Sequence, residues 1–131
     1  MLFKEGDTFG SGYEVNEEIY HGFIHIFKDE NPLHTDDLYA RENKFEAKVM
    51  HGAILVGFLS HFIGEVLPVK NVVVLSYGIA FNKPVYLGDK LWLSGMVSDV
   101  SESTNCVDIK YEFKNINDSL VSKGKISIKI I

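Results

Sequence analysis

The segment from His51 to Pro68, HGAILVGFLSHFIGEVLP, constrains the fold of this chain more than any other part of it. Its apolar residues fall on nearly all sides of a helix of about 15 residues, which would be about 22 Å long. A helix with apolar residues on nearly every side has to be covered by the rest of the protein. Pro68 cannot continue a helix, so we expect the helix to end there.

Beyond this segment, the spacing of apolar residues changes from the helical period to an alternation of two, which indicates strands. Four runs show this alternation: 72–81, 91–100, 107–114 and 125–130. The last two alternate apolar with polar or charged residues and are expected to be half-buried strands. Residues 72–81 are apolar on both faces, so we expect this strand to be central or at an interface. The short connections LGDK, SESTN and NINDS favour antiparallel neighbours.

A curved antiparallel sheet wrapped around the central helix is the economical way to cover that helix in a chain of 131 residues. The length fits one domain and is too short for two of ordinary size. We therefore predict an α+β fold, with residues 1–131 in a single domain. Apolar surface left over on residues 72–81 favours association with a second copy of the chain.

Shorter elements are expected in the first half of the chain. A short strand is expected around residues 13–15, and Asn16 is expected to cap a helix that follows it. One face of this helix would carry Ile19, Phe23, Ile26 and Phe27. A second, short helix is expected after the turn at NPLH, with its first N–H groups bonded to Thr35 or Asp36.

Charge and composition exclude several classes of function. The net charge of −5 argues against a protein that binds nucleic acid, because phosphate backbones need a basic face. No segment reaches the roughly 18 consecutive apolar residues of a membrane helix, and the N-terminus does not resemble a signal peptide. The expected location is therefore the cytoplasm. Cys106 is the single cysteine, so no internal disulfide can form.

The stretch DENPLH, residues 29–34, places a carboxylate and an imidazole on one short turn. In the structural interpretation, Pro32 fixes the turn and Asp29 bonds to nearby backbone N–H groups. In the functional interpretation, Asp29 and His34 jointly orient a water and exchange protons with it, for which an imidazole that titrates near neutral pH is suited. These residues alone leave both interpretations open.

A second candidate is VMHGA, residues 49–53, at the entrance to the buried helix. A backbone N–H of Gly52 at a helix N-terminus would favour negative charge, as on the oxygen of a thioester that becomes an enolate. Alternatively, Gly52 only allows the helix to pack closely against the sheet. Ser60 is polar in an apolar segment, so it either bonds to the backbone one turn earlier or helps to hold the candidate turn.

The remaining histidines do not indicate a metal site. His21 and His25 have the spacing of a two-histidine metal site, but no Glu or Cys arrangement completes it. His61 is expected at the boundary of the buried helix. We therefore predict no bound metal.

The motifs DENPLHTD, VMHGAILVGFLS, LP and FNKPVYLGDKL together resemble the MaoC-like hydratase/dehydratase family, in particular its (R)-specific enoyl-CoA hydratases. They occur in the family's order from Asp29 to Asp89. The resemblance implies a single hot-dog fold, in which a curved antiparallel sheet wraps a long central helix and two subunits pair their sheets. Many members have a small residue before the catalytic Asp, whereas this chain has Lys28. That departure bears on substrate scope and rate more than on the reaction class.

The same resemblance implies a hydro-lyase that hydrates trans-2-enoyl thioesters or dehydrates (R)-3-hydroxyacyl thioesters. Asp29 and His34 would be the catalytic pair that activates a water, and the Gly52 N–H would bind the thioester oxygen. Residues that bind substrate would be Asn31, His51 and Ser60. No cofactor is implied, since a CoA or acyl-carrier-protein thioester is the substrate. The implied partner is a second copy, in a homodimer or a higher homo-oligomer.

Two other functions stay open. A hot-dog thioesterase would hydrolyse the same kind of ester, but it more often carries its carboxylate on the central helix, where this chain has only Glu65 at the far end. A non-catalytic subunit that binds acyl thioesters would need none of the catalytic groups. The phosphate of CoA or of a carrier could be bound by Arg41, Lys44 and Lys48, although a solvated surface explains these residues equally well.

Overall fold

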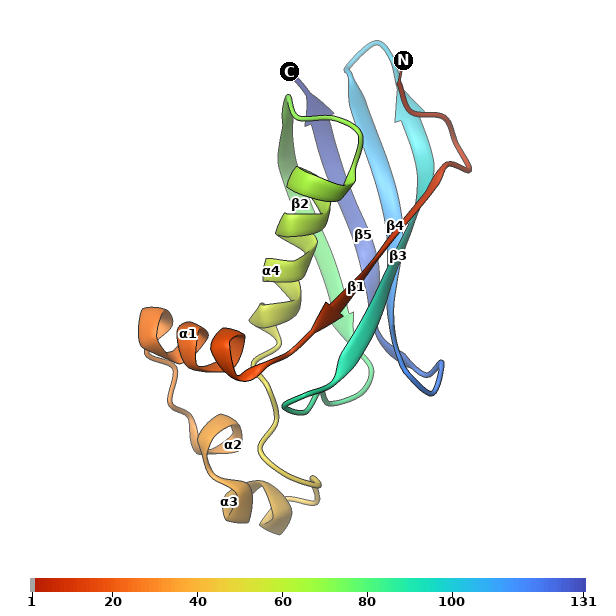
Figure 1. Ribbon diagram of the computed structural model, residues 1–131. Coiled ribbons are helices and arrows are strands. Elements are labelled where there is room, and N and C mark those ends of the chain that lie inside the picture. The colour runs from red at the N-terminus through yellow and green to blue at the C-terminus, as the bar shows by residue number, and fades with distance from the viewer. Residues whose placement is uncertain (1) are drawn as a thin grey trace.

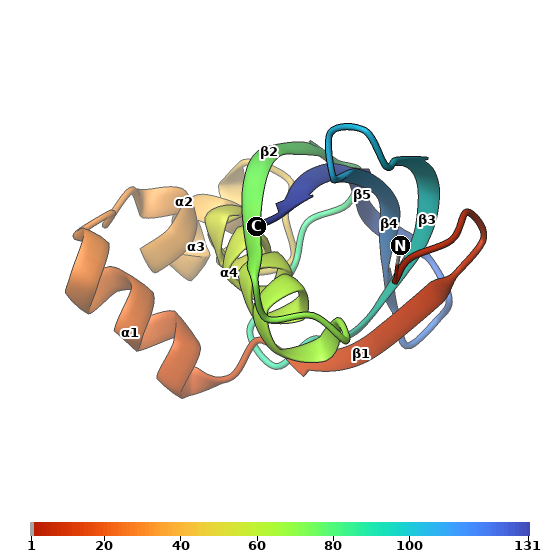
Figure 2. The same ribbon diagram turned by 90° about the horizontal axis from the view of Figure 1, so that it is seen from above.

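The computed structural model describes residues 2–131 (Figure 1). In chain order its elements are β1 (Thr8–Glu14), α1 (Glu17–Phe27), α2 (Pro32–Thr35), α3 (Asp37–Glu42), α4 (Ala53–His61), η1 (Phe62–Val66), β2 (Val72–Phe81), β3 (Lys90–Ser101), β4 (Cys106–Asn115) and β5 (Leu120–Ile130). The strands form one antiparallel sheet in the order β1-β3-β4-β5-β2. Viewed from above, this sheet curls around α4 (Figure 2). The predicted α+β architecture is therefore confirmed.

The core lies between the concave face of the sheet and the helix formed by α4 and η1. Buried helix side chains are Ile54, Leu55, Phe58, Leu59, Phe62 and Ile63. Buried strand side chains opposite them include Leu91, Leu93, Val97, Val107, Ile109, Tyr111, Phe113, Ile126 and Ile128. Each fully buried large apolar side chain contributes about 1.5–3 kcal/mol to folding, which makes this contact the main source of stability.

The predicted central helix is confirmed, but its burial on nearly every side is not. Ala53, Gly57 and Ser60 are exposed, because the sheet covers only one side of α4. The helix also changes its hydrogen bonding at Phe62, where the π-helical η1 begins. Leu67 then adopts an extended conformation directly before Pro68, as the sequence indicated.

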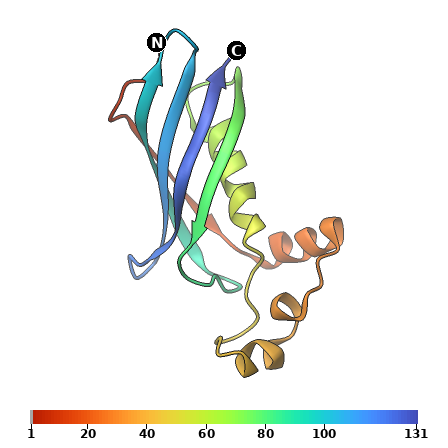
Figure 3. The ribbon, with the colours of Figure 1, turned by 180° about the vertical axis from the view of Figure 1, so that it is seen from behind.

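β2 is an edge strand, so the first of the two predictions for residues 72–81, a central strand, is wrong. The second, a strand at an interface, stays a prediction. The partner of β2 is β5, in a register that runs from Val72 opposite Ile130 to Phe81 opposite Ser122. The prediction that LGDK joins neighbouring strands is wrong for the same reason: residues 82–89 cross one end of the sheet to reach β3 (Figure 3). The connections 102–105 and 116–119 do join neighbours.

The three helices α1, α2 and α3 extend away from the sheet at one end of α4 (Figures 1 and 3). The predicted cap of α1 is confirmed, since the Ile19 N–H donates to Asn16 Oδ1 at 2.9 Å. Asp36 caps α3 by accepting from two backbone N–H groups. The Thr35 hydroxyl instead donates to backbone carbonyls one turn earlier. The strand expected around residues 13–15 is longer than predicted and is β1.

The predicted apolar face of α1 is only partly packed. Ile26 and Phe27 are 66% and 68% exposed, because the end of α1 reaches beyond the body of the protein. Tyr20, which the sequence did not single out, is the buried residue of this helix. No helix within residues 2–131 has both the length and the apolar character to cross a membrane.

Candidate functional site

The turn that carries Asp29 begins with a left-handed residue at the end of α1. Lys28 has φ 62°, and its N–H donates to the Ile24 carbonyl at 2.8 Å. Glycine is the usual residue in this conformation, because other L-residues lose about 1–2 kcal/mol there. The left-handed residue ends the helix, and the exposed Asp29 follows it directly.

Asn31 links this aspartate to α2. The Asn31 N–H donates to Asp29 Oδ1 at 3.2 Å, and the Asn31 Oδ1 accepts from the Leu33 N–H at 3.0 Å. Pro32 occupies the first position of α2, where a missing N–H is tolerated. The Asn31 side-chain oxygen thus caps the one-turn helix on which His34 lies.

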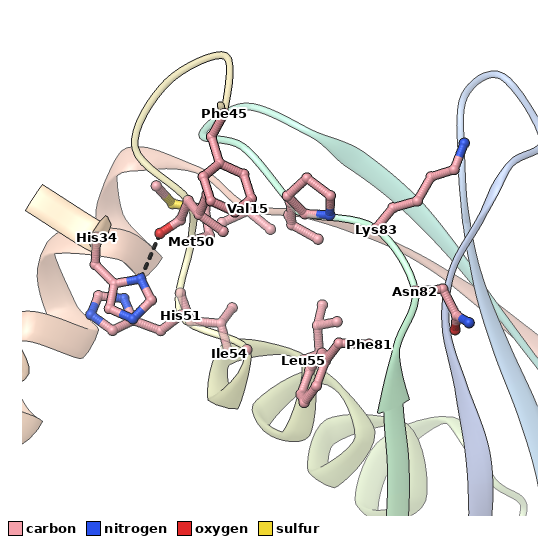
Figure 4. Close-up of a pocket in the computed structure, with 14 residues that line it drawn as sticks. Val15, His34, Phe45, Met50, His51, Ile54, Leu55, Phe81, Asn82 and Lys83 are labelled. Carbon is pink, nitrogen blue, oxygen red and sulfur yellow. Dashed lines mark hydrogen bonds between the residues drawn. The ribbon is translucent and has the colours of Figure 1, made fainter. Parts of the chain in front are cut away.

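The half-buried imidazole of His34 is oriented by a backbone carbonyl. Its Nδ1 lies 2.7 Å from the Val49 oxygen (Figure 4). A carbonyl can only accept, which assigns the proton to Nδ1 and leaves the Nε2 of the neutral ring as a free lone pair. The backbone of α2 is held as well, since the Tyr20 hydroxyl donates to the His34 carbonyl at 2.6 Å.

Gly52 occupies the N-cap position of α4, and its N–H has no acceptor among residues 2–131. A side chain at this position would require the exposed Phe81 ring of β2 to move, because a Cβ there would lie 2.8 Å from that ring. The structure thus has the feature that each interpretation requires, and the binding of a thioester oxygen stays a prediction. A backbone donor is available at a helix N-terminus, and the glycine permits a close approach of α4 to the end of β2.

His51 directly precedes Gly52 and is buried, with 3% of its surface exposed. The structure brings it together with the predicted catalytic pair. One carboxylate oxygen of Asp29 and one ring nitrogen each of His34 and His51 all lie within 4.8 Å of one another. These residue types also bind metals, so the expectation that no metal is bound remains a prediction.

Residues of this cluster line two cavities. The smaller, of about 380 Å³, is lined by His34, His51 and Gly52, with Phe81 opposite the two imidazole rings (Figure 4). The larger, of about 1220 Å³, lies between α1 and α4, and Asp29 and Ser60 are among its lining residues. Asp29 thus contributes to one cavity and His34 to the other. A carboxylate and an imidazole lone pair in this arrangement can hold one water and move its protons.

Ser60 is a predicted site residue that lines the larger cavity and not the smaller one. It is exposed on α4 and is bordered in the larger cavity by apolar residues such as Val56 and Tyr77. Asp29 likewise lines only the larger cavity, and Asn31 is absent from the described linings of both. The exposed His21 and His25 also lie away from the cluster, and His21 pairs with Glu17 at 2.8 Å.

The predicted phosphate-binding cations do not line either cavity among the described residues. Arg41 donates to the Glu46 carbonyl at 3.2 Å, and the Lys48 ammonium lies 4.8 Å from the centre of the Tyr20 ring. Lys83, which the sequence analysis passed over, does line the smaller cavity. The sequence feature that could have identified Lys83 is its position as a basic residue within the motif FNKP.

Comparison with known proteins gives a consistent result. The family model described as "MaoC like domain" matches residues 7–117. The (R)-specific enoyl-CoA hydratase of Aeromonas caviae is 27% identical over 108 residues, which cover 82% of this chain and 81% of that protein. The mitochondrial 3-hydroxyacyl-[acyl-carrier-protein] dehydratase of Arabidopsis thaliana is 30% identical over 129 residues, covering 95% and 75%.

The solved structure of an (R)-hydratase from A. caviae involved in PHA biosynthesis superposes with a TM-score of 0.91. The superposition covers 100% of this chain and 99% of the A. caviae chain, and the sequence identity is 23%. At this identity the likeness shows the fold alone, which is the hot-dog fold. The fold expected from the sequence motifs is thereby confirmed.

Proposed function

This chain belongs to the MaoC-like dehydratase family, and from that premise we propose that it is a hydro-lyase acting on acyl thioesters. The reaction is the (R)-specific hydration of a trans-2-enoyl thioester, or the reverse dehydration of an (R)-3-hydroxyacyl thioester. The observation that carries the proposal is the convergence of a carboxylate and an oriented imidazole beside a free backbone N–H.

In the proposed reaction, Asp29 and the Nε2 of His34 hold one water between them. The water oxygen bonds to C3 while a proton passes from the water to the pair, and C2 receives a proton as the C2–C3 double bond becomes single. Charge that develops on the thioester oxygen is stabilised by the Gly52 N–H, a type of contact worth about 3 kcal/mol in enzymes with such a donor. Each step uses a group on the described turn or at the start of α4.

The substrate enters as a CoA or acyl-carrier-protein thioester, and the reaction needs no further cofactor. The larger cavity suits the acyl chain, since Ile19, Phe23 and Val56 make its walls apolar. Lys83 at the smaller cavity is a candidate for the phosphate of the carrier. We further propose a cytoplasmic enzyme that associates with a second copy of itself.

The proposal is tested by following the loss of enoyl absorbance when purified protein is mixed with trans-2-enoyl-CoA esters of four carbons and longer. Asp29→Asn and His34→Ala are each expected to lower kcat/KM by about 10²–10⁴. His25→Ala is the matched control, because His25 is exposed on α1 and outside the described linings of both cavities. The proposal fails if every chain length is inert, both as CoA and as carrier-protein ester.

The structure gives less support to the thioesterase alternative than the sequence did. Glu65, the carboxylate of the central helix, is exposed and pairs with Lys70 at 3.2 Å, outside the described cavity linings. A thiol-trapping reagent in the same assay separates the two reactions, since only hydrolysis releases free thiol. A non-catalytic subunit would bind the ester with unchanged affinity after Asp29→Asn and would turn nothing over.

A further inference from the structure

We infer that His51 is a positioning residue, which fixes the places of Asp29 and His34 relative to the Gly52 N–H. The inference rests on the proposed function and deepens it. The sequence predicted that His51 contacts substrate, whereas its contacts in the structure are with the catalytic turn. Three observations support a positioning role: a reciprocal pair of hydrogen bonds, a stack of three rings and an unpaired ring nitrogen.

The first observation is that two histidines connect the same two segments, residues 29–34 and 49–51, and that each segment provides one of them. His51 Nε2 lies 2.8 Å from the backbone oxygen of Asp29, which can only accept, so this nitrogen carries the ring's proton. His34 Nδ1 makes the corresponding hydrogen bond from the other segment and lies 2.7 Å from the Val49 oxygen. Each segment therefore donates an imidazole N–H to a carbonyl of the other. Together these bonds fix the turn relative to the start of α4.

The second observation is that the His51 ring lies between two other rings. The centre of the His34 ring is 4.0 Å away on a plane tilted by 31°, and the centre of the Phe23 ring is 4.5 Å away with a tilt of 35°. The stack joins α1, α2 and the residue before Gly52. Because the side chain is 3% exposed, the ring cannot change rotamer without displacing His34.

The third observation concerns the other nitrogen of His51. Its Nδ1 is buried and has no hydrogen-bond partner within residues 2–131. A buried acceptor without a partner costs about 1–3 kcal/mol, and the somewhat larger phenyl ring of a phenylalanine would not carry that cost. Packing alone therefore does not favour histidine here. The Nε2–H bond to Asp29 is the contact that a phenyl ring could not make.

The same geometry argues against a direct contact between His51 and substrate. Nε2 is already bonded to the Asp29 carbonyl, and Nδ1 is closed off from the cavity by its burial. A substrate could reach only the ring edge. The effect of His51 on the reaction is therefore exerted through Asp29 and His34, where a displacement of about 1 Å can lower the rate about 100-fold.

Three substitutions separate the contributions of the ring and the donor. His51→Gln places an amide N–H2 close to the position of Nε2 and keeps the bond to Asp29 without the ring. His51→Phe keeps the ring between His34 and Phe23 but removes the donor, and His51→Ala removes both. The matched control is His61→Gln, an exposed histidine that contacts Tyr13 instead.

The readouts are kcat and KM for an enoyl-CoA ester, with circular dichroism and urea unfolding to confirm that each variant folds. We expect kcat to fall about 10–100-fold in His51→Phe and His51→Ala, with KM within about twofold of the wild type. His51→Gln should recover at least about threefold in kcat over His51→Phe. His61→Gln should match the wild type.

A rise in KM at unchanged kcat would overturn the inference in favour of substrate contact. Equal kcat in the Gln and Phe variants, or wild-type kinetics in both, would overturn it as well. An inactive wild type would contradict the proposed function instead. In that case the ring-nitrogen NMR shifts of His34 still decide the inference: one Nδ1–H tautomer is expected in the wild type and His51→Gln, and a mixture in His51→Phe. An unchanged tautomer in His51→Phe would overturn it.

Discussion

The backbone angle φ of Lys28 determines where α1 ends and where the candidate carboxylate of Asp29 follows it. This φ of 62° ends α1 and leads directly to Asp29. The sequence showed an unusual residue before the candidate carboxylate, but not that the position is left-handed. The structure supplies the physical reason why a glycine would suit it, since glycine adopts this conformation without steric cost.

We predict that Lys28→Gly raises the free energy of unfolding by about 1 kcal/mol, because the left-handed strain of the lysine is relieved. Urea unfolding followed by circular dichroism measures the change. Lys44→Gly is a matched control: Lys44 has φ 75° outside the candidate site, so it should gain similar stability without changing activity. A loss of stability in Lys28→Gly would show that its side-chain contacts outweigh the strain.

At the residue scale, the types of the candidate site residues could be predicted from the sequence, but the hydrogen-bond partners that orient them could not. Asp29, His34 and Gly52 could be predicted as site residues because each is a type that carries chemistry in a motif. Tyr20 and Val49 could not, since one acts through a hydroxyl directed at a backbone carbonyl and the other through its own carbonyl. Every residue has such a carbonyl, so no sequence pattern marks the one that orients a histidine.

At the scale of elements, one side chain joins strands that are not neighbours. The Tyr111 hydroxyl on β4 donates to the Gly78 carbonyl on β2 at 2.7 Å, although β5 lies between these strands. The hydroxyl passes Gly124 of β5, where a Cβ would overlap the Gly78 oxygen and would lie 2.7 Å from the tyrosine oxygen. The glycine therefore makes room for a bond that helps to hold the edge strand β2.

Gly124→Ala is expected to destabilise the protein by about 3 kcal/mol or more, because neither the backbone oxygen nor the buried tyrosine can move aside. The control is Gly22→Ala in α1, where a Cβ meets nothing within 4 Å. That change should be neutral or stabilising by about 1 kcal/mol through helix propensity. Thermal and urea unfolding measure both variants, and equal stabilities would contradict this account of Gly124.

Burial raises the pKa of Tyr111 to about 12 from its ordinary value of 10.0. The folded state therefore holds this proton more tightly than the unfolded state, so the stabilisation is present below pH 10 and is lost as the pH rises towards 12. Urea midpoints measured between pH 9 and 12 should fall more steeply for the wild type than for Tyr111→Phe. Parallel curves would show that Tyr111 does not titrate in this way.

The sequence predicted the faces of the strands better than their order. The buried residues of β4, and those of β5 from Ile126 onward, alternate with polar or charged ones, so local spacing was sufficient to assign their faces. The order of the strands depends on pairing between distant segments. β2 is apolar on both faces, and nothing in its own residues distinguishes a central strand from an edge strand.

At the scale of the whole molecule, apolar side chains remain exposed on α1 and on the edge strand β2. Ile26 and Phe27 of α1 and Leu75 of the edge strand β2 are 66%, 68% and 55% exposed. Ile26 and Phe27 also line the larger cavity, so a partner that covers them would close the proposed acyl-chain site. Together with the unpaired edge of β2, this surface suits a second copy of the chain.

Light scattering coupled to size-exclusion chromatography should give the mass of a dimer, or of a multiple of it, at micromolar concentration. Leu75→Asp should shift the protein towards the monomer, because a carboxylate would be buried in the middle of the proposed interface. Ile116→Asp is the control, since Ile116 is exposed in the turn between β4 and β5 and should leave the mass unchanged. A monomeric wild type would contradict the proposed association.

The central claim is that Asp29 and His34 act as one unit on the same water. A double-mutant cycle on kcat/KM for a trans-2-enoyl-CoA ester tests it most directly, using Asp29→Asn, His34→Ala and the double variant. Groups that work together on one step are strongly non-additive, so the double variant should be no more than about threefold slower than the slower single variant. A double variant whose loss equals the product of the two single losses would contradict the claim.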